Sequence, residues 1–350
     1  MNQKFYLLII ITIIYISCNS TENINYEVFD EFPTTINISC EEIKTIPELY
    51  SVGGMLIMDD FIVTVDLKAD TFFRLFDSQN YNYLSGFIGR GGGPGEEFFI
   101  DPFIQKISVD KFIYKNIASV KTLQFNKERK ELNVVEEIVL PTEIMDIWHV
   151  FKLNNLLIGY TVSEGTEKEF KGFNPVTKEI FDFGMSFPDV GKKIEPLYKN
   201  VIFAKANIVK PDMTKFASAY DKFPILRIFD LNGNIIREIR YNNNQSFPNA
   251  LINENPSQAD VDEVMQNYRM IKSTDQYIYA LYIGKKEREI ERGLNDFSNE
   301  IHIWDWDGNP VKRILLDKKI FTFDVNKEDD YLICCSLESL DRFYKYSLKD

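Results

Sequence analysis

The segment from residue 89 to residue 98 holds the residue types that come closest to a binding chemistry. Five of the seven residues at 89–95 are glycine, and Arg90 lies among them. Glycines let successive backbone N–H groups converge on one point, so the segment could cradle an anionic or polar ligand beside the arginine. It lacks the Lys-Ser/Thr ending of a phosphate-binding P-loop, and we expect a strand rather than a helix after it. The alternative is a structural crossing, in which Arg90 and Glu96 tie neighbouring parts of the fold together. The residues of this candidate loop are Gly89, Arg90, Gly91, Gly93, Pro94, Gly95 and Glu96.

No set of residues has the spacing of a catalytic or metal centre. The two histidines, His149 and His302, have no evident Ser and Asp partners, and no Gly-x-Ser-x-Gly motif of a serine hydrolase occurs. The cysteines form no Cys-x-x-Cys pair that would indicate zinc or a thioredoxin-like centre. Four aspartates lie near the ends of expected inner strands, where converging carboxylates could hold a metal, although turn capping is the commoner use of such residues. These are Asp59, Asp60, Asp101 and Asp146. We therefore predict no catalytic residue, no metal site and no cofactor.

The first 18 residues predict an export signal rather than part of the fold. Lys4 supplies a positive start, a twelve-residue apolar stretch follows over 5–16, and the segment ends in Ser17 and Cys18. The apolar stretch is too short to span a bilayer comfortably. A small residue followed by cysteine resembles the bacterial lipobox, which implies that Cys18 carries lipid and anchors the protein to a membrane; Tyr15 stands where a lipobox usually has Leu. An ordinary signal peptide is the alternative. We expect the polar residues 19–32 to form a tether.

A short pattern that returns six times indicates the architecture. Each copy places an aromatic residue near the end of an apolar run, and these aromatic anchors are 49, 48, 56, 75 and 42 residues apart. A period of roughly 40–50 residues, with four strands in each unit, is the signature of a β-propeller. The abundance of Phe and Tyr also favours strands over helices. We therefore predict an all-β fold, a six-bladed β-propeller. The anchors are Phe76, Phe125, Phe173, Phe229, Trp304 and Tyr346.

The sixth repeat ends after its third strand, so the ring needs a strand from elsewhere. Residues 34–40 alternate polar and apolar side chains, and we predict that they supply the outer strand of blade six, which closes the ring with both termini in one sheet. Residues 41–58 would then cross inward to the innermost strand of blade one. This organisation predicts a single propeller domain over 33–350. The longest insertion, 243–268, is expected to hold a helix capped by Ser257.

The chain as a whole resembles a known family. A Gly-Pro-Gly-Glu loop at 93–96, after the first blade and behind a lipobox, is similar to that of the six-bladed β-propeller lipoproteins of Bacteroides and relatives, often labelled TolB-like. The resemblance covers essentially the whole chain after Cys18. It implies the propeller fold and a lipid-anchored place in the cell envelope, at the outer membrane and facing either the periplasm or the exterior. It implies no catalytic residue.

Two functions fit these features. The first, which we expect, is a non-catalytic binding module that presents the loops of one propeller face to a glycan, a peptide or a protein. The second is a channel-centred, metal-dependent hydrolase of the lactonase-like kind, which requires three or more carboxylates around one point of the channel. A channel lined by Leu, Ile and Phe would favour the binding module.

The net charge of −13 argues against a nucleic-acid partner, because an acidic surface repels phosphate backbones. The loops expected on the binding face are 68–71, 89–97, 163–167, 220–224 and 284–298. Tyr220 and Phe223 near them could stack on sugars, although packing within the rim is the commoner use of such residues.

Overall fold

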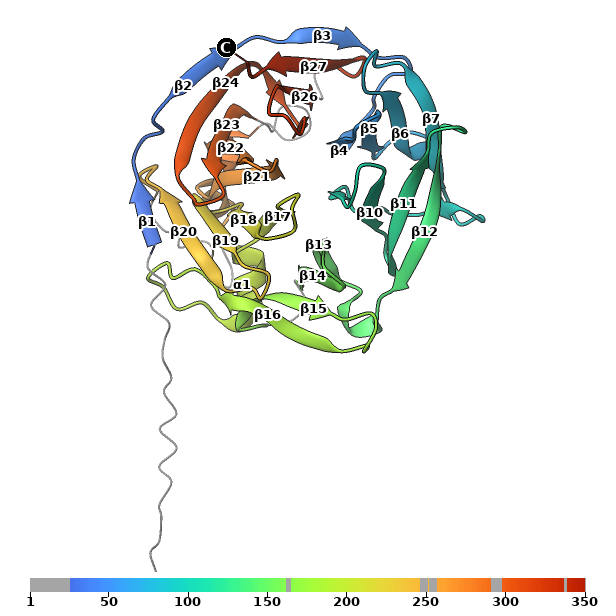
Figure 1. Cartoon of the computed structure of the whole chain (residues 1–350). Coiled ribbons are helices and arrows are strands. Elements are labelled where there is room, and N and C mark those ends of the chain that lie inside the picture. The colour runs from blue at the N-terminus through green and yellow to red at the C-terminus, as the bar shows by residue number, and fades with distance from the viewer. Residues whose placement is uncertain are drawn as a thin grey trace, which may run out of the picture.

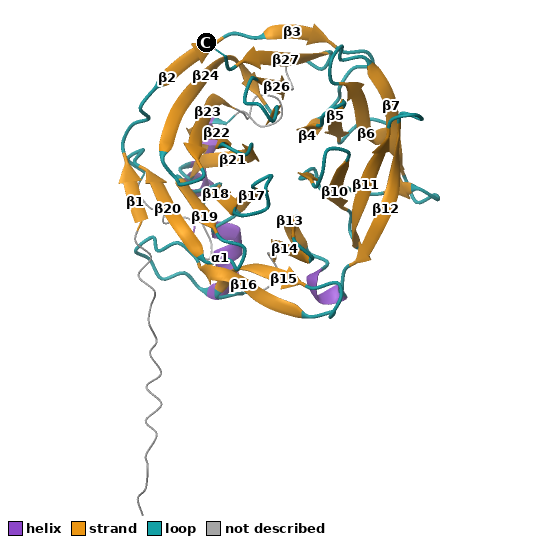
Figure 2. Cartoon of the chain, in the orientation of Figure 1, coloured by secondary structure: helices purple, strands orange, loops and turns teal. Residues whose placement is uncertain are grey.

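The computed structural model describes residues 26–161, 165–245, 251, 257–290, 298–336 and 339–349. Six β-sheets stand side by side in a ring around a central axis (Figure 1). The few described helices lie in the connections between strands (Figure 2). The prediction of an all-β, six-bladed β-propeller is confirmed. Within the part of the chain that the structure describes, no helix combines the length and the apolar character needed to cross a bilayer.

The first three blades are built from consecutive strands, which run in order from the axis outward. Blade one holds β4 (Val52–Ile57), β5 (Phe61–Asp66), β6 (Thr71–Asp77), β7 (Tyr83–Arg90) and β8 (Glu96–Glu97). Blade two holds β9 (Gln105–Lys106), β10 (Lys111–Lys115), β11 (Ser119–Asn126) and β12 (Glu131–Val139). Blade three holds β13 (Ile147–Leu153), β14 (Leu156–Thr161), β15 (Lys168–Phe173) and β16 (Ile180–Ser186).

The other three blades each gain an outer strand from the N-terminal segment. Blade four holds β17 (Lys205–Val209), β18 (Phe216–Tyr220), β19 (Ile225–Phe229), β20 (Ile235–Tyr241) and β1 (Tyr26–Phe29). Blade five holds β21 (Met265–Ser273), β22 (Tyr277–Lys286), β23 (Ser298–Asp305), β24 (Pro310–Ile320) and β2 (Thr35–Ile38). Blade six holds β25 (Thr322–Val325), β26 (Tyr331–Cys335), β27 (Arg342–Ser347) and β3 (Glu41–Lys44).

The core lies between neighbouring blades. An inner strand is covered on both faces, so all six residues of β5 are buried, whereas most of the outer strand β12 is exposed. All six aromatic anchors are buried, which is why the repeat could be read from the sequence. The rings of Phe73 in blade one and Phe112 in blade two illustrate the contact, with centroids 5.4 Å apart.

Residues 26–44, which we call the N-terminal belt, follow the outer edges of blades four, five and six in turn (Figure 1). β1 pairs in parallel with β20, and β2 pairs in parallel with β24. β3 pairs antiparallel with β27 and completes blade six. Between β1 and β2, the ring of Phe32 lies against His302, with centroids 4.4 Å apart, and thereby fixes the belt to blade five.

The belt confirms closure by an N-terminal strand but corrects the segment that performs it. The strand predicted at 34–40 is present as β2, yet it forms a fifth strand of blade five, and Glu41–Lys44 supplies the missing strand of blade six. Residues 26–29, expected within the tether, form β1. The alternation of polar and apolar side chains in 34–40 indicates a strand with one covered face, and Ile36 and Ile38 do pack on the core. The same pattern does not indicate to which sheet the strand belongs. The innermost strand of blade one lies where it was predicted, at β4.

The ring has two faces that differ in the length of their connections. Tight turns between the first and second and between the third and fourth strands of each blade form one face, which we call the turn face. Loops between second and third strands, together with the crossings from blade to blade, form the other, which we call the crossing face. It carries η1 (Thr142–Ile144), α1 (Pro196–Ile202), α2 (Gln258–Asp262) and η3 (Glu287–Glu289). Ser257 caps α2 as predicted, although the helix ends early because β21 begins at Met265.

Candidate functional site

The glycine loop lies on the crossing face, where it leads from blade one to blade two. One of its amides binds a carboxylate of the loop itself, because Glu96 Oε2 accepts a hydrogen bond of 2.8 Å from the N–H of Gly93. Gly91 has φ 148° and Gly95 has φ 78°, a backbone region that favours glycine. A Cβ at Gly91 would lie 2.2 Å from Glu96 Oε2. The glycines therefore make room for the Glu96 side chain, which stands where an anionic ligand was considered.

Arg90 holds the loop to its own blade. Its Nε donates to the carbonyl oxygen of Ala69 at 2.5 Å, and its Nη2 donates to that of Asp66 at 2.7 Å. The guanidinium carbon lies 3.8 Å from the centre of the Phe72 ring. Burial lowers the pKa of Arg90, although the group stays charged. These contacts favour the structural crossing over a ligand-binding loop. The partners of Arg90 are backbone carbonyl oxygens of Asp66 and Ala69 rather than the Glu96 carboxylate that the sequence suggested.

Asp66 joins two connections on the crossing face, a role that no pattern in the sequence indicated. Its carboxylate is buried and accepts hydrogen bonds from the N–H groups of Tyr50 at 2.8 Å and Ser51 at 3.0 Å. The same carboxylate accepts from the N–H groups of Lys68 and Ala69, each at 3.1 Å. The crossing into blade one and the loop of β5 and β6 are thus held together, and Arg90 adds the glycine loop to them.

Four large apolar side chains are exposed on the connections that Asp66 and Arg90 hold. They are Ile46 (75% exposed), Tyr50 (47%), Phe98 (76%) and Phe99 (39%), which we call the crossing-face apolar residues. Phe98 is seated against the loop backbone, because a Cβ at Gly92 would approach its Cζ to 2.8 Å. Aromatic and large aliphatic side chains of this kind are the residue types that anchor protein interfaces.

The two aromatic residues that could have stacked on sugars pack inside the fold instead. Tyr220 and Phe223, considered for sugar stacking, are both buried. Tyr220 donates to Glu169, which also pairs with Arg227 and, at 3.2 Å, with Lys205. The network joins blade three to blade four, so its buried charges are paired across a blade interface. Burial lowers the pKa of Lys205 to about 8.

The four aspartates considered for a metal go to separate local partners. Asp59 pairs with Lys106 at 3.3 Å and with Lys327 at 3.4 Å, while Asp60 pairs with Lys127 at 2.5 Å. Asp146 accepts from the hydroxyl of Thr161 at 2.8 Å. Asp101 is buried and accepts from the N–H of Phe103 at 3.0 Å, and burial raises its pKa to about 6. Within the described ranges, no three His, Cys, Asp or Glu side chains are grouped so that they could hold a metal ion.

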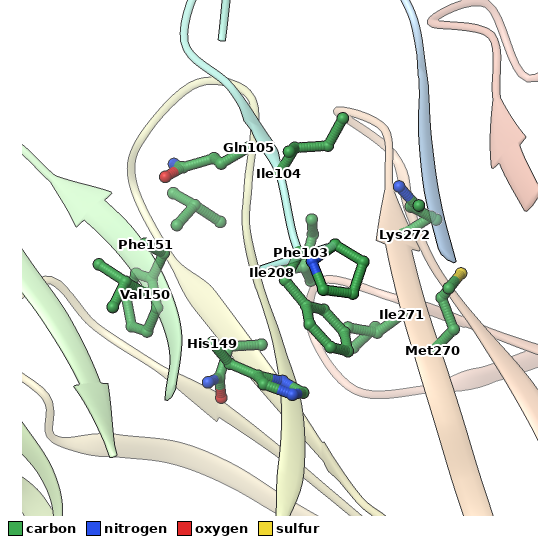
Figure 3. Close-up of a pocket in the computed structure, with 14 residues that line it drawn as sticks. Phe103, Ile104, Gln105, His149, Val150, Phe151, Ile208, Met270, Ile271 and Lys272 are labelled. Atoms are coloured by element: carbon green, nitrogen blue, oxygen red, sulfur yellow. The ribbon is translucent and has the colours of Figure 1, made fainter. Parts of the chain in front are cut away.

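The central channel holds two adjoining hollows. An inner cavity of about 30 Å³ lies between the inner strands (Figure 3), and a basin of about 270 Å³ opens from it toward the turn face. Five residues line both, among them Ile104, Ile208 and Lys272. Val150, Phe151 and Ile271 add to a mainly apolar inner wall. Such a lining favours the binding module over the channel-centred hydrolase.

Two polar side chains in the inner cavity were not predicted as site residues from the sequence. His149 stacks on Phe103 with ring centroids 3.4 Å apart (Figure 3), and its φ of 49° turns it out of the regular strand. Burial lowers the pKa of His149 to about 3. Its Nδ1 and the Nδ2 of Asn207 are buried without a hydrogen-bond partner among the described atoms. A lone histidine flanked by apolar residues in an inner strand is the signal that could have drawn attention to this position.

Comparison with known proteins agrees with the fold. Residues 49–349 match the model of a family described as TolB-like 6-blade propeller-like. A member of the DUF4221 family from Bacteroides vulgatus superposes with a TM-score of 0.63 at 10% identity, over 89% of this chain and 96% of that one. A "putative exported protein" from Bacteroides fragilis superposes with a TM-score of 0.57 at 12% identity, over 91% of this chain and 100% of the other. At these identities the likeness shows the fold alone. No curated protein matches the chain.

Proposed function

The chain belongs to the TolB-like 6-blade propeller-like family, and from that premise we propose that it is a lipid-anchored, non-catalytic binding module of the cell envelope. Its partner is a protein segment that docks on the crossing face. Cys18, which lies outside the described residues, carries the lipid and anchors the protein at the outer membrane, facing the periplasm or the exterior. The export signal and the lipobox-like Ser17-Cys18 support this location.

The observation that carries the proposal is the exposure of Phe98 on a loop that is already ordered. The ring is 76% exposed, yet the loop beneath it is fixed by Arg90 and by the hydrogen bond between Gly93 and Glu96. A preorganised aromatic residue binds with little loss of conformational entropy, and such residues often dominate the energy of protein interfaces. Tyr50 and Ile46 offer further apolar contact on a neighbouring connection.

Charge indicates the chemistry of the partner. Exposed carboxylates lie on the same connections, at Glu48, Asp70 and Glu96, and the chain carries a net charge of −13. A segment with an apolar anchor and flanking Lys or Arg residues is complementary to this surface, and its association should weaken with salt. The partner we propose is therefore a basic, amphipathic peptide segment of another protein.

The test is a peptide array probed with residues 19–350, which include every described residue, beside a glycan array. We expect binding to basic peptides that carry an aromatic or aliphatic anchor, and at least a tenfold loss for Phe98→Ser. Val176→Ser is the matched control, because Val176 is 80% exposed in a turn of blade three on the opposite face. Equal binding by both variants, or selective binding to glycans, would refute the proposal.

A further inference from the structure

One lysine is buried in the wall of the central channel. Lys272 lines both the inner cavity and the basin, so it lies where the two hollows join (Figure 3). Its side chain is only 9% exposed. Lysine is almost never buried to this extent unless its ammonium group is paired, so the partners of Nζ determine what the amine can do.

The head group of Lys272 has few partners. Nζ donates to the carbonyl oxygen of Met55 at 2.5 Å, and Oδ1 of Asp324 lies 3.9 Å away, beyond hydrogen-bond distance. An ammonium group has three N–H donors, so two of them have no acceptor among the described protein atoms. Met55 belongs to β4 of blade one and Asp324 to β25 of blade six, so the amine is held where three blades meet the channel.

Burial favours the uncharged forms of Lys272 and Asp324. It lowers the pKa of the lysine and raises the pKa of the aspartate. The Asp324 carboxyl group is held in place by the N–H of Ile57, which donates to Oδ2 at 2.6 Å. A proton that passes from the ammonium group to this carboxylate leaves a free amine beside a carboxylic acid. A lysine desolvated in an apolar pocket is the form of the residue that reacts with carbonyl compounds to give an imine.

The basin gives a small molecule access to this amine. Its volume is about 270 Å³, it opens on the turn face, and apolar side chains such as Ile107, Val109 and Met213 form much of its wall. A mainly apolar pocket with a few fixed polar groups is the usual form of a small-molecule site. Such walls favour a ligand with an uncharged, apolar body.

Three other lysines line the same basin, and their surroundings differ from those of the buried one. Lys106 and Lys327 share the carboxylate of Asp59, at 3.3 Å and 3.4 Å, and Lys210 pairs with Asp212. The side chains of Lys106 and Lys327 are 33% and 63% exposed. Hydration and a close carboxylate both favour the protonated ammonium, which is not a nucleophile. These three lysines therefore serve as an internal comparison.

We propose that Lys272 binds a small, apolar aldehyde as a reversible imine, with the body of the ligand in the basin. The Nζ lone pair forms a bond to the carbonyl carbon, and the carbonyl oxygen takes a proton from Asp324. The nitrogen returns a proton to Asp324, which then protonates the new hydroxyl group, and this group leaves as water. A protonated imine remains beside the Asp324 carboxylate. The sum is an ammonium group and an aldehyde giving a protonated imine and water, so the step needs no oxidant or reductant.

The test is reductive trapping of residues 19–350 with hexanal and sodium cyanoborohydride, which converts an imine to a stable alkylamine. The labelled protein is digested, and the alkylated lysines are identified by mass spectrometry. With hexanal limiting, we expect Lys272 to be labelled at least tenfold more than each of the other three basin lysines. The preference should disappear in urea, where all four lysines are hydrated. Glyoxylate, an aldehyde with a negative charge, should show no preference for Lys272.

Two variants complete the experiment. Lys272→Arg keeps a positive charge but forms no imine with hexanal, so total labelling should fall while labelling of the other basin lysines and the melting temperature stay unchanged. Phe98→Ser alters the opposite face and should be labelled as wild type, which separates this site from the partner-docking proposal. The wild-type result decides the matter even if Lys272→Arg does not fold. Equal labelling of the four lysines in the folded protein would overturn the proposal, as would an equal preference of glyoxylate for Lys272.

Discussion

Replacing Arg90 with alanine is the most direct test of the structural role of the glycine loop. The change removes two hydrogen bonds, to the carbonyl oxygens of Ala69 and Asp66, and the contact of the guanidinium with the Phe72 ring. It leaves the glycines and Glu96 in place. If the arginine anchors the loop, the free energy of unfolding must fall.

The size of the effect follows from these contacts. A hydrogen bond from a charged donor contributes about 1.5 kcal/mol, and a partly exposed cation–π contact contributes about 0.5 kcal/mol. Two hydrogen bonds and the ring contact give about 3.5 kcal/mol. Arg90 is only partly buried, so water can solvate some of the freed carbonyl groups, and we expect a net loss of about 2–3 kcal/mol.

The assay is urea unfolding of residues 19–350, followed by tryptophan fluorescence. Arg129→Ala is the matched control, because the Arg129 side chain is 74% exposed and its ion pair with Glu131 spans 3.5 Å. An exposed pair of this kind contributes well under 1 kcal/mol. If Arg90→Ala unfolds at the same urea concentration as Arg129→Ala, the anchoring role is wrong and a role for Arg90 in binding has to be reconsidered.

Three further predictions concern other parts of the molecule. Burial raises the pKa of Asp101 to about 6, above its unfolded value of about 4, so the free energy of unfolding falls as pH rises from about 4 to about 6 and stays lower above that. Asp101→Asn should therefore be more stable than wild type by about 2–3 kcal/mol at pH 8, and a difference that persists at pH 4 in thermal melts would contradict this. Removing residues 26–38 should leave a ring that still melts in one step. Removing 26–44 should open blade six and lower the free energy of unfolding by several kcal/mol. Equal melting temperatures for the two deletions would refute the closing role of β3. Cells fed a fatty-acid analogue should label the wild-type protein, and labelling that survives Cys18→Ala would exclude lipid attachment at that residue.

The fold could be predicted because the aromatic anchors repeat and are all buried. Phe76, Phe229 and Tyr346 are fully covered, so their spacing reports the blade period directly. The closing strand could not be located from its composition. Glu41–Lys44 contains one partly buried residue, Ile43, among three exposed ones, so it reads as a polar connection. β3 pairs with β27 because the chain brings it to that edge and because backbone hydrogen bonds form there, and neither factor depends on a particular residue type.

The candidate sites were predicted less completely, because their side chains bind backbone groups or line a cavity, and neither feature has a sequence pattern. The glycine loop was located, yet the partners of Arg90 are carbonyl oxygens, which every residue has. Asp66 looks like any strand-ending aspartate, although its carboxylate accepts four backbone hydrogen bonds. His149 and Asn207 lie about sixty residues apart and line one cavity only because inner strands of different blades converge on one axis.

The N-terminal belt also sets the order in which the chain can fold. Its three strands are synthesised first, but their partners β20, β24 and β27 follow only in blades four, five and six. Glu42 and Arg342, which form an ion pair, are 300 residues apart in the sequence. Contacts of such long range form slowly, because the intervening chain must be ordered before they stabilise it. β1 can pair once β20 has emerged, but β2 and β3 must stay unpaired, with their edges accessible, until blades five and six have been made. A nascent chain that stalls after blade four would display exposed edges that invite aggregation, so a chaperone that shields extended segments should matter most during this interval.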